Sequence, residues 1–384
     1  MIKRTAQSTL AEMAKGFPVL AVTGPRQSGK STLVRATFPK KPYISFDALD
    51  TLESARSDPR GFLAAYPQGA IIDEAQRLPE LFSYIKLIVD EKKQHGMFVL
   101  TGSQQFGLMA SITESLAGRV GIVELLPFCL KELQSAKRSP STLDELLYKG
   151  MYPPLYDKKL RPDQWFSGYV TSYIERDVIR MLAVKELSVF KRFLRLCAAR
   201  TGQLLNISNL ANECGISLPT TRSWIAVLEA SYIIYLLQPH FVNFGKRLVK
   251  TPKLYFYDTG LVTWLLNIQN ADHLSIHPSR GSLFENFVVS ELLKRRFNKG
   301  LVSNIYFWRD NLGDEIDVLI DNGTERVPVE IKSGATVTDD QLKTLLKWEK
   351  ISKNKAPSYL VYGGDQTHIR HAIRVLPWTS TEKI

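Results

Sequence analysis

Short apolar runs alternate with helix-like segments over the first third of the chain. The apolar runs are Phe17–Thr23, Tyr43–Phe46, Ala70–Asp73, Met97–Thr101 and Val120–Leu125. Between the third and fourth runs, Leu81, Ile85 and Ile88 recur at helical spacing, and Pro79 lies near the start of that segment. Strands that alternate with helices are typical of a parallel sheet covered by helices. The pattern therefore predicts an α/β domain built on five parallel strands.

After about residue 130 the pattern becomes helical. Apolar residues recur every three or four positions in Leu182–Ala199 and in Ile207–Leu237. Within the second segment, Ile207–Gly215 and Leu218–Leu228 flank a short turn, and Thr220–Trp224 opens the second helix. This arrangement fits a helix-turn-helix that binds DNA. The alternative is a plain helical hairpin, because such helix pairs are common in helical regions.

The last third returns to β-rich segments. Strands are predicted at Ile305–Arg309, Glu315–Ile320, Val327–Ile331 and Ser358–Tyr362. Helices are expected at about Phe284–Phe297, before the first of these strands, and at Asp339–Glu349, between the third and the fourth. These changes of pattern predict three domains, covering residues 1–130, 131–250 and 251–384.

A glycine-rich motif follows the first apolar run directly. It consists of Gly24, Pro25, Arg26, Gln27, Ser28, Gly29, Lys30 and Ser31, with Thr32 next. The motif fits G-x-x-x-x-G-K-[ST] and lies between a strand and a helix, as a phosphate loop requires. Its glycines let the backbone wrap around phosphate oxygens, and its amides and the helix N-terminus supply positive charge. Lys30 is predicted to neutralise the β- and γ-phosphates of ATP, and Ser31 to ligate Mg²⁺.

The third apolar run ends in two acids, Asp73 and Glu74. Asp73 is predicted to hold the metal through water, and Glu74 to polarise the attacking water. An ordinary strand end could also carry two acids, but the phosphate loop upstream makes that interpretation the weaker one. Together the two motifs predict a site for ATP and Mg²⁺.

Two more positions are candidates for the same site. Ser103 and Gln104 follow the fourth strand, and in a parallel sheet the carboxyl ends of strands face the ligand crevice, so either residue could sense the γ-phosphate. Arg119 precedes the fifth strand. It is a candidate for stabilising transition-state charge in its own subunit or a neighbour's, and the alternative is a structural or surface arginine.

Acids and a lysine also gather in the predicted C-terminal strands. Asp317 lies in one strand, and Glu330 and Lys332 share one face of the next. Glu285, on the preceding helix, adds another acid. This is the pattern of PD-(D/E)xK nucleases, in which two carboxylates bind Mg²⁺ and the lysine helps to activate water. The alternative is an acid-x-Lys pattern on a solvated strand face, and a nuclease-like fold would not by itself specify cleavage.

Other polar residues are assigned structural roles. Asp258 is predicted to be an N-cap or turn residue rather than a catalytic one. Trp308 is predicted to be a packed side chain beside a surface arginine, Arg309, and the alternative is that the two residues contact a nucleic-acid backbone.

The motifs together resemble a known family, the prokaryotic AAA+-type ATPases whose C-terminal half is a domain of unknown function. In the first third the resemblance rests on GPRQSGKST, AIIDEAQ, LTGSQQ and SLAGRV. It continues through KGMYPP, YIERDV, PKLYFYDTGL, LFENFVVSEL, EIDVLI and VEIKSG, so it covers nearly the whole chain. The resemblance implies an ATPase domain, then a winged-helix segment, then a restriction-endonuclease-like region. One departure is Gln104, where relatives often have a second serine, which leaves the sensor assignment between Ser103 and Gln104 open.

Composition adds a preference for acidic partners. The chain has 50 Lys and Arg against 38 Asp and Glu, a formal net charge of +12. Such a surplus favours nucleic acid, here double-stranded DNA, ahead of an anionic membrane surface, although solubility alone is the other interpretation. Three cysteines without paired spacing argue against a disulfide framework and a Cys-based zinc site. With no signal peptide and no run of roughly 18 apolar residues, a cytoplasmic protein without a membrane partner is expected.

The predicted fold class is therefore α/β, with a P-loop NTPase parallel-sheet domain, a helical or winged-helix segment, and an α/β restriction-endonuclease-like domain. The predicted function is Mg²⁺-dependent ATP hydrolysis coupled to a DNA-directed C-terminal region. One alternative is an ATP-dependent switch that regulates DNA or a protein partner without cutting. Another is an ATP-gated nuclease. The sequence leaves a monomer, a dimer and a ring-shaped oligomer all open.

Overall fold

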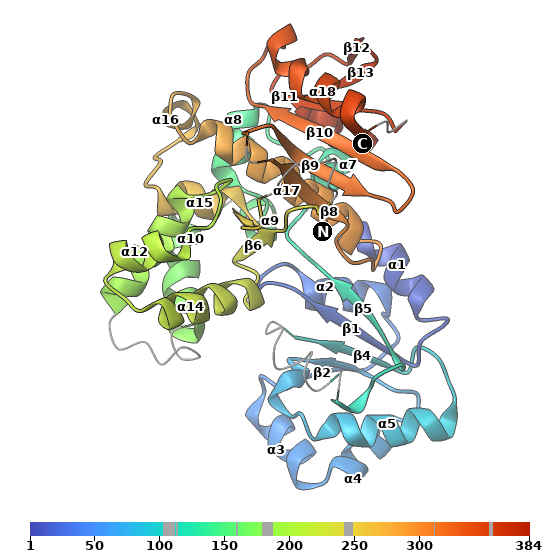
Figure 1. Cartoon of the computed structure of the whole chain (residues 1–384). Coiled ribbons are helices and arrows are strands. Elements are labelled where there is room, and N and C mark those ends of the chain that lie inside the picture. Colours follow the sequence, from blue (N-terminus) through green and yellow to red (C-terminus); the bar gives the residue numbers. More distant parts are fainter. Residues whose placement is uncertain are drawn as a thin grey trace. The chain divides into compact units, whose positions relative to one another are not determined.

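The computed structural model describes residues 1–102, 112, 114–158, 160–178, 187–241, 249–310, 312–352 and 356–384. They form two compact units (Figure 1). The N-terminal unit consists of Met1–Phe128, Ala230–Tyr232 and Arg296–Val302. The C-terminal unit consists of Cys129–Glu229, Ile233–Arg295 and Ser303–Ile384.

The N-terminal unit is built on a parallel sheet with the strand order β2-β3-β4-β1-β5. The strands are β1 (Val19–Thr23), β2 (Tyr43–Ser45), β3 (Ile71–Asp73), β4 (Phe98–Thr101) and β5 (Val120–Glu124), as the apolar runs predicted. The helices are α1 (Ala6–Met13), α2 (Lys30–Thr37), α3 (Leu49–Ser57), α4 (Pro59–Ala64), a 3₁₀ turn (Ala75–Arg77) and α5 (Leu81–Lys92). Because all five strands run the same way, their carboxyl ends meet at one edge.

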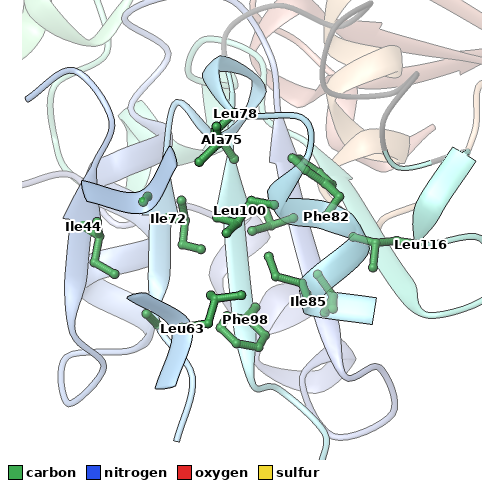
Figure 2. Close-up of a cluster of buried hydrophobic side chains, with 14 of the residues drawn as sticks. Ile44, Leu63, Ile72, Ala75, Leu78, Phe82, Ile85, Phe98, Leu100 and Leu116 are labelled. Carbon is green, nitrogen blue, oxygen red and sulfur yellow. The ribbon is translucent and has the colours of Figure 1, made fainter. Parts of the chain in front are cut away.

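Both faces of this sheet are buried. Successive residues of β1 alternate between two hydrophobic clusters on opposite faces, and all five are buried. Figure 2 shows the first cluster, in which Ile72 and Leu100 of neighbouring strands pack with Phe82 and Ile85 of α5. This explains the unbroken apolar runs, because a strand covered on both sides has no solvent-facing positions.

The C-terminal unit begins with helices. They are α7 (Leu130–Ser135), α8 (Leu143–Lys149), α9 (Pro153–Asp157), α10 (Pro162–Tyr169), a π-helical turn (Val170–Val178), α12 (Leu187–Ala199), α13 (Ile207–Cys214) and α14 (Leu218–Ala230). Gly215 closes α13 at φ 69°, a left-handed conformation that favours glycine, so the predicted helix, turn and second helix are present. The predicted helical segment does not extend to Leu237, however. Tyr232 at φ 56° interrupts it, and Ile234–Leu237 form strand β6, paired antiparallel with β7 (Lys253–Phe256).

A second sheet follows α15 (Thr259–Leu265), α16 (Ala271–Ser275) and α17 (Arg280–Phe297). Its strand order is β12-β13-β11-β10-β9-β8. The strands are β8 (Ile305–Arg309), β9 (Glu315–Asp321), β10 (Arg326–Lys332), β11 (Tyr359–Tyr362), β12 (His368–Arg370) and β13 (Ile373–Pro377), and the remaining helices are a 3₁₀ turn (Asp339–Leu342), α18 (Lys343–Ser352) and a 3₁₀ turn (Trp378–Lys383). β8, β9 and β10 are antiparallel neighbours, whereas β10, β11 and β13 are parallel.

Two structural predictions for this unit are confirmed. Trp308 is 1% exposed and packs edge-on against Trp348. Asp258 caps α15, where its carboxylate accepts a hydrogen bond from the amide of Leu261. The helices of the described ranges include none that is both long and apolar enough to cross a bilayer.

Candidate functional sites

The phosphate loop joins β1 to α2, and its glycines are required by geometry. Gly24 has φ 138°, and a Cβ there would lie 2.2 Å from the carbonyl oxygen of Leu125. Gly29 has φ 93° and is the N-cap of α2. Arg4 holds the loop from outside, since its guanidinium donates 2.6 Å hydrogen bonds to the carbonyls of Ser28 and Leu126. Sequence analysis missed Arg4, because nothing in the N-terminal segment distinguishes it from a surface cation.

Lys30 is a buried cation aimed at its own loop. It is 6% exposed, and its ammonium donates to the carbonyls of Gly24 (2.9 Å) and Pro25 (2.8 Å). Burial lowers the Lys30 pKa to about 8, against the opposing charges of Glu74 and Asp73. The hydroxyl of Ser28 is also buried, and no group in the described ranges bonds to it. A polyphosphate would give both groups an acceptor, so the loop fits ATP.

Three hydroxyl groups converge on the buried carboxylate of Asp73. Ser31 at the start of α2 donates at 3.0 Å, Tyr43 of β2 donates at 2.5 Å, and Thr101 at the end of β4 also donates. Burial and the bond to Asp73 raise the Tyr43 pKa to about 12, so this group stays a donor. Ser31 and Asp73, the predicted metal-binding pair, are therefore in direct contact. Sequence analysis missed Tyr43 and passed over Thr101, because strand-end position alone does not show which hydroxyls reach the acid.

Glu74 follows Asp73 in an unusual backbone conformation. Its φ is 54°, in the left-handed region that non-glycine residues rarely adopt. Its carboxylate accepts a 2.5 Å hydrogen bond from the amide nitrogen of Gln76. Such conformations concentrate at functional sites, where surrounding structure maintains them.

Of the remaining candidates for this site, the structure describes Arg119 alone, and it places Arg119 elsewhere. Ser103 and Gln104 lie outside the described residues. Arg119 precedes β5, and its carbonyl accepts from the amide of Val19, the first residue of β1. It therefore lies at the opposite edge of the sheet from Lys30, where its guanidinium pairs with Asp90 of α5 through bonds of 2.5 and 2.9 Å.

A second polar cluster lies in the C-terminal unit, where β9 and β10 carry the predicted acids. The Lys332 ammonium is 2.5 Å from the Glu330 carboxylate and 3.7 Å from Asp317. Asp317 also accepts a 2.8 Å hydrogen bond from the amide of Ile331. Glu285 of α17 interacts electrostatically with Asp317, so all four predicted residues belong to one cluster, here called the acid cluster.

Three further residues complete the acid cluster, and sequence analysis missed them. Lys253 of β7 is 2.9 Å from Glu285 and also pairs with Glu315 of β9. Tyr255, two residues along β7, donates a 2.5 Å hydrogen bond to Glu285. No local pattern distinguishes Lys253 and Tyr255, because β7 reaches the cluster only through tertiary folding.

The electrostatics of the acid cluster are those of crowded, buried carboxylates. Burial, reinforced by Asp317, raises the Glu330 pKa to about 8, and burial also raises the pKa of Glu285. Burial opposes the charge of Lys253, but Glu285, Asp317 and Glu315 outweigh it and raise the Lys253 pKa. Oε2 of Glu330 is buried and lacks a hydrogen-bond partner within the described ranges, an arrangement that fits a cation. The described side chains nevertheless include no group of three His, Cys, Asp or Glu placed to hold a metal ion.

Comparisons with known proteins match three segments of the chain to family models. Residues 16–134 match the AAA domain, and residues 140–272 and 280–381 match two domains of unknown function (DUF8612 and DUF4143). Uncharacterized proteins of Mycobacterium tuberculosis and Mycobacterium bovis are each 32% identical over 338 residues, which cover 87% of this chain and 74% of the relative. The chain belongs to the family of these mycobacterial proteins. Its N-terminal unit thus carries the AAA-type ATPase domain of that family.

More distant likenesses add little. Within the same comparison, an uncharacterized protein of Haemophilus influenzae is 27% identical over 215 residues, about half of each chain. Among solved structures, a Walker-type ATPase of Pyrococcus abyssi has 17% identity and a TM-score of 0.47, covering 69% of this chain and 96% of its own. AMPPCP-bound DnaA of Aquifex aeolicus has 14% identity and a TM-score of 0.30, covering 58% and 85%. TM-scores below 0.5 support no argument about this chain.

Proposed function

We propose that this chain binds and hydrolyses ATP with Mg²⁺ at the phosphate loop, and that the nucleotide cycle regulates a DNA-directed C-terminal unit. The observation that carries the proposal is the direct contact of Ser31 with Asp73 beside the buried ammonium of Lys30. A serine hydroxyl and a carboxylate offer the oxygen ligands that Mg²⁺ prefers, and phosphate oxygens complete such a site.

Each residue has a distinct role in this proposal. The backbone of residues 24–32 holds the phosphates, and Lys30 exchanges its loop carbonyls for phosphate oxygens. Ser31 would ligate Mg²⁺ and Asp73 would hold it through water, and the ion would supply positive charge to the phosphates. Glu74 accepts the proton of the attacking water. Ser103 or Gln104 contacts the γ-phosphate, and Arg119 is a candidate only for a neighbouring chain's site, because it lies at the far edge of its own sheet.

The test is nucleotide binding by calorimetry together with phosphate release. The wild-type protein is expected to bind ATP in the presence of magnesium and to turn it over. Lys30→Ala should remove turnover, whereas Lys15→Ala, which changes an exposed lysine paired with Glu12, should leave it unchanged. A wild-type protein with no affinity for nucleotide in the presence of magnesium would contradict the proposal.

The second candidate function is nucleic-acid cleavage at the acid cluster. The buried Oε2 of Glu330, to which no described residue forms a hydrogen bond, favours it, because a divalent cation would satisfy that atom. Asp317 and Glu330 would hold Mg²⁺, Lys332 would help to activate water, and Glu285 adds negative charge beside them. Asp317→Ala combined with Lys332→Ala should abolish Mg²⁺-dependent cleavage of a nucleic-acid panel assayed with and without ATP. A wild-type protein that cuts no member of the panel would instead support a non-cleaving switch.

DNA binding has its own support in the C-terminal unit. The α13–turn–α14 pair precedes the β6–β7 pair, an order typical of winged-helix domains, and Arg222 and Ser223 of α14 are exposed. Phosphate contacts would make DNA affinity fall steeply with salt. An affinity that hardly changes with salt would exclude substantial phosphate contact.

A further inference from the structure

The acid cluster has two lysines, and they are held very differently. The Lys332 side chain is 32% exposed and pairs with Glu330 and Asp317. The Lys253 side chain is 4% exposed and pairs with Glu285 and Glu315. The two lysines therefore differ in access. Lys332 can be reached from solvent, whereas Lys253 is enclosed, although the side chains of its partners Glu285 and Glu315 are 18% and 22% exposed.

The backbone of β7 fixes Lys253 from both sides. On one side, Lys253 pairs with Leu237 of β6. On the other, residues 202–205 form hydrogen bonds of 2.7–3.0 Å with Pro252 and Leu254, the two neighbours of Lys253. The ring of Phe307 lies 5.6 Å from the ammonium, and Tyr255 holds Glu285 in place. A side chain packed in this way has little freedom to leave, whereas Lys332 can rotate into solvent.

We propose that Lys253 is a built-in cation of the acid cluster, which permanently neutralises the Glu285–Glu315 half and confines any divalent cation to Asp317 and Glu330. An ammonium and a divalent ion compete for the same carboxylate oxygens and repel each other at close range. Metal entry at Asp317 and Glu330 requires only that the exposed Lys332 moves aside. This inference rests on the acid cluster as a cation site and is independent of ATP hydrolysis.

The experiment measures Mn²⁺ binding to nucleotide-free protein by calorimetry and by the paramagnetic resonance of free Mn²⁺. Lys253→Met is expected to bind one additional Mn²⁺ per chain, or to bind it at least tenfold more tightly than the wild type. The double variant Lys253→Met/Glu285→Gln removes the uncovered acid and should lose that gain. Lys343→Met, at an exposed lysine paired with Asp340, is the matched control and should bind as the wild type does.

Lys253→Met could fail to fold, because it removes the lysine partner of Glu285 and leaves Glu315 with Arg309 alone, so Glu285→Gln provides a second test. If Lys253 already occupies Glu285, this variant should leave Mn²⁺ affinity unchanged within about twofold, whereas Asp317→Asn should abolish binding at the cluster. A tenfold loss in Glu285→Gln would make Glu285 a metal ligand and overturn the proposal. The proposal is also overturned if Lys253→Met binds Mn²⁺ as the wild type does, or if neither the wild type nor this variant binds Mn²⁺ at the acid cluster. The experiment measures metal binding and not DNA cleavage, so its result stays valid even if the protein cleaves no nucleic acid.

Discussion

The phosphate loop and the acid cluster both contain buried charged groups, but these groups have opposite kinds of partner. At the phosphate loop, a buried lysine donates to backbone carbonyls, which are neutral. In the acid cluster, buried carboxylates are already paired with the ammonium groups of Lys253 and Lys332. Among the described residues the Lys30 ammonium thus forms no direct ion pair, although Glu74 and Asp73 act on it from further away, while the acid cluster supplies much of its own counter-charge.

The difference predicts how each site responds to its ligand. Lowering of the Lys30 pKa to about 8 means that burial disfavours its charge, and a phosphate anion would relieve that cost. Raising of the Glu330 pKa to about 8 means that burial, reinforced by Asp317, disfavours its charge, and a cation would relieve that cost only after Lys332 moves away. We therefore expect ligand binding to raise the free energy of unfolding strongly at the loop and less at the acid cluster.

The largest expected effect is on the chemistry of the loop. Glu74→Gln keeps the size of the side chain but cannot accept a proton, so ATP turnover should fall about 10²–10⁴-fold. Nucleotide affinity should be retained, because Lys30 and the loop amides are untouched. Single-turnover phosphate release and calorimetry separate the two quantities. Glu80→Gln, at an exposed glutamate nearby, is the control, and equal losses of turnover and of affinity would contradict the assigned role.

The next effect concerns the stability of the acid cluster and its dependence on pH. Unfolded chains lose the Glu330 proton near pH 4.5, whereas the folded protein keeps it until about pH 8. Between these values the folded state binds the additional proton, so the free energy of unfolding should fall as pH rises, by about 1.4 kcal/mol per pH unit. Glu330→Gln should flatten this slope.

The measurement is urea unfolding in metal-free buffer, followed by tryptophan fluorescence. All six tryptophans of the sequence lie in the C-terminal unit, so the signal reports on that unit. Glu382→Gln, at an exposed acid, should keep the slope of the wild type. If Glu330→Gln left the slope unchanged, the result would contradict the raised Glu330 pKa and with it the contrast between the two sites.

The two sites also differ in how far the sequence could predict them. Lys30, Ser31, Asp73 and Glu74 come from a motif and a strand end, and local spacing places them at one sheet edge. The parallel sheet itself followed from apolar runs, since strands buried on both faces have no polar positions. The strands could be predicted because the composition of a buried strand is a local property of the chain, whereas the roles of the four residues stay a prediction.

Tertiary folding determines the rest. Lys253 and Tyr255 reach the acid cluster on β7, a strand separated from β9 and β10 along the chain, and no local pattern shows that pairing. Strands β12 and β13 were not predicted either, because they are short and contain polar residues. Ile234–Leu237 was assigned to a helix because four apolar or aromatic residues fit both periodicities.

A smaller effect on turnover is expected when one of the hydroxyl groups that donate to Asp73 is removed. Tyr43→Phe removes the hydroxyl that donates to Asp73 but keeps the ring beneath Arg35, 4.9 Å from its guanidinium carbon. Ser31 and Thr101 still hold the carboxylate, so turnover should fall by no more than about tenfold, which is equivalent to about 1.4 kcal/mol or one ordinary hydrogen bond. The magnesium dependence of turnover is the measurement. Tyr66→Phe is the control, and a loss as large as that of Glu74→Gln would assign Tyr43 a part in the chemistry.

The smallest expected effect is at Arg119. Exposed ion pairs contribute little to stability, and Arg119 lies at the edge of the sheet away from Lys30, so Arg119→Gln should leave turnover within about twofold of the wild type. An arginine supplied to a neighbouring chain would behave differently, because losing such a group costs 10³–10⁵ in turnover. Mixing Arg119→Gln chains with Lys30→Ala chains distinguishes these two roles of Arg119. If Arg119→Gln is inactive and regains activity when mixed with inactive Lys30→Ala chains, Arg119 acts on a neighbour's nucleotide. If the variant is active alone and mixing adds nothing, its pairing with Asp90 is its whole role.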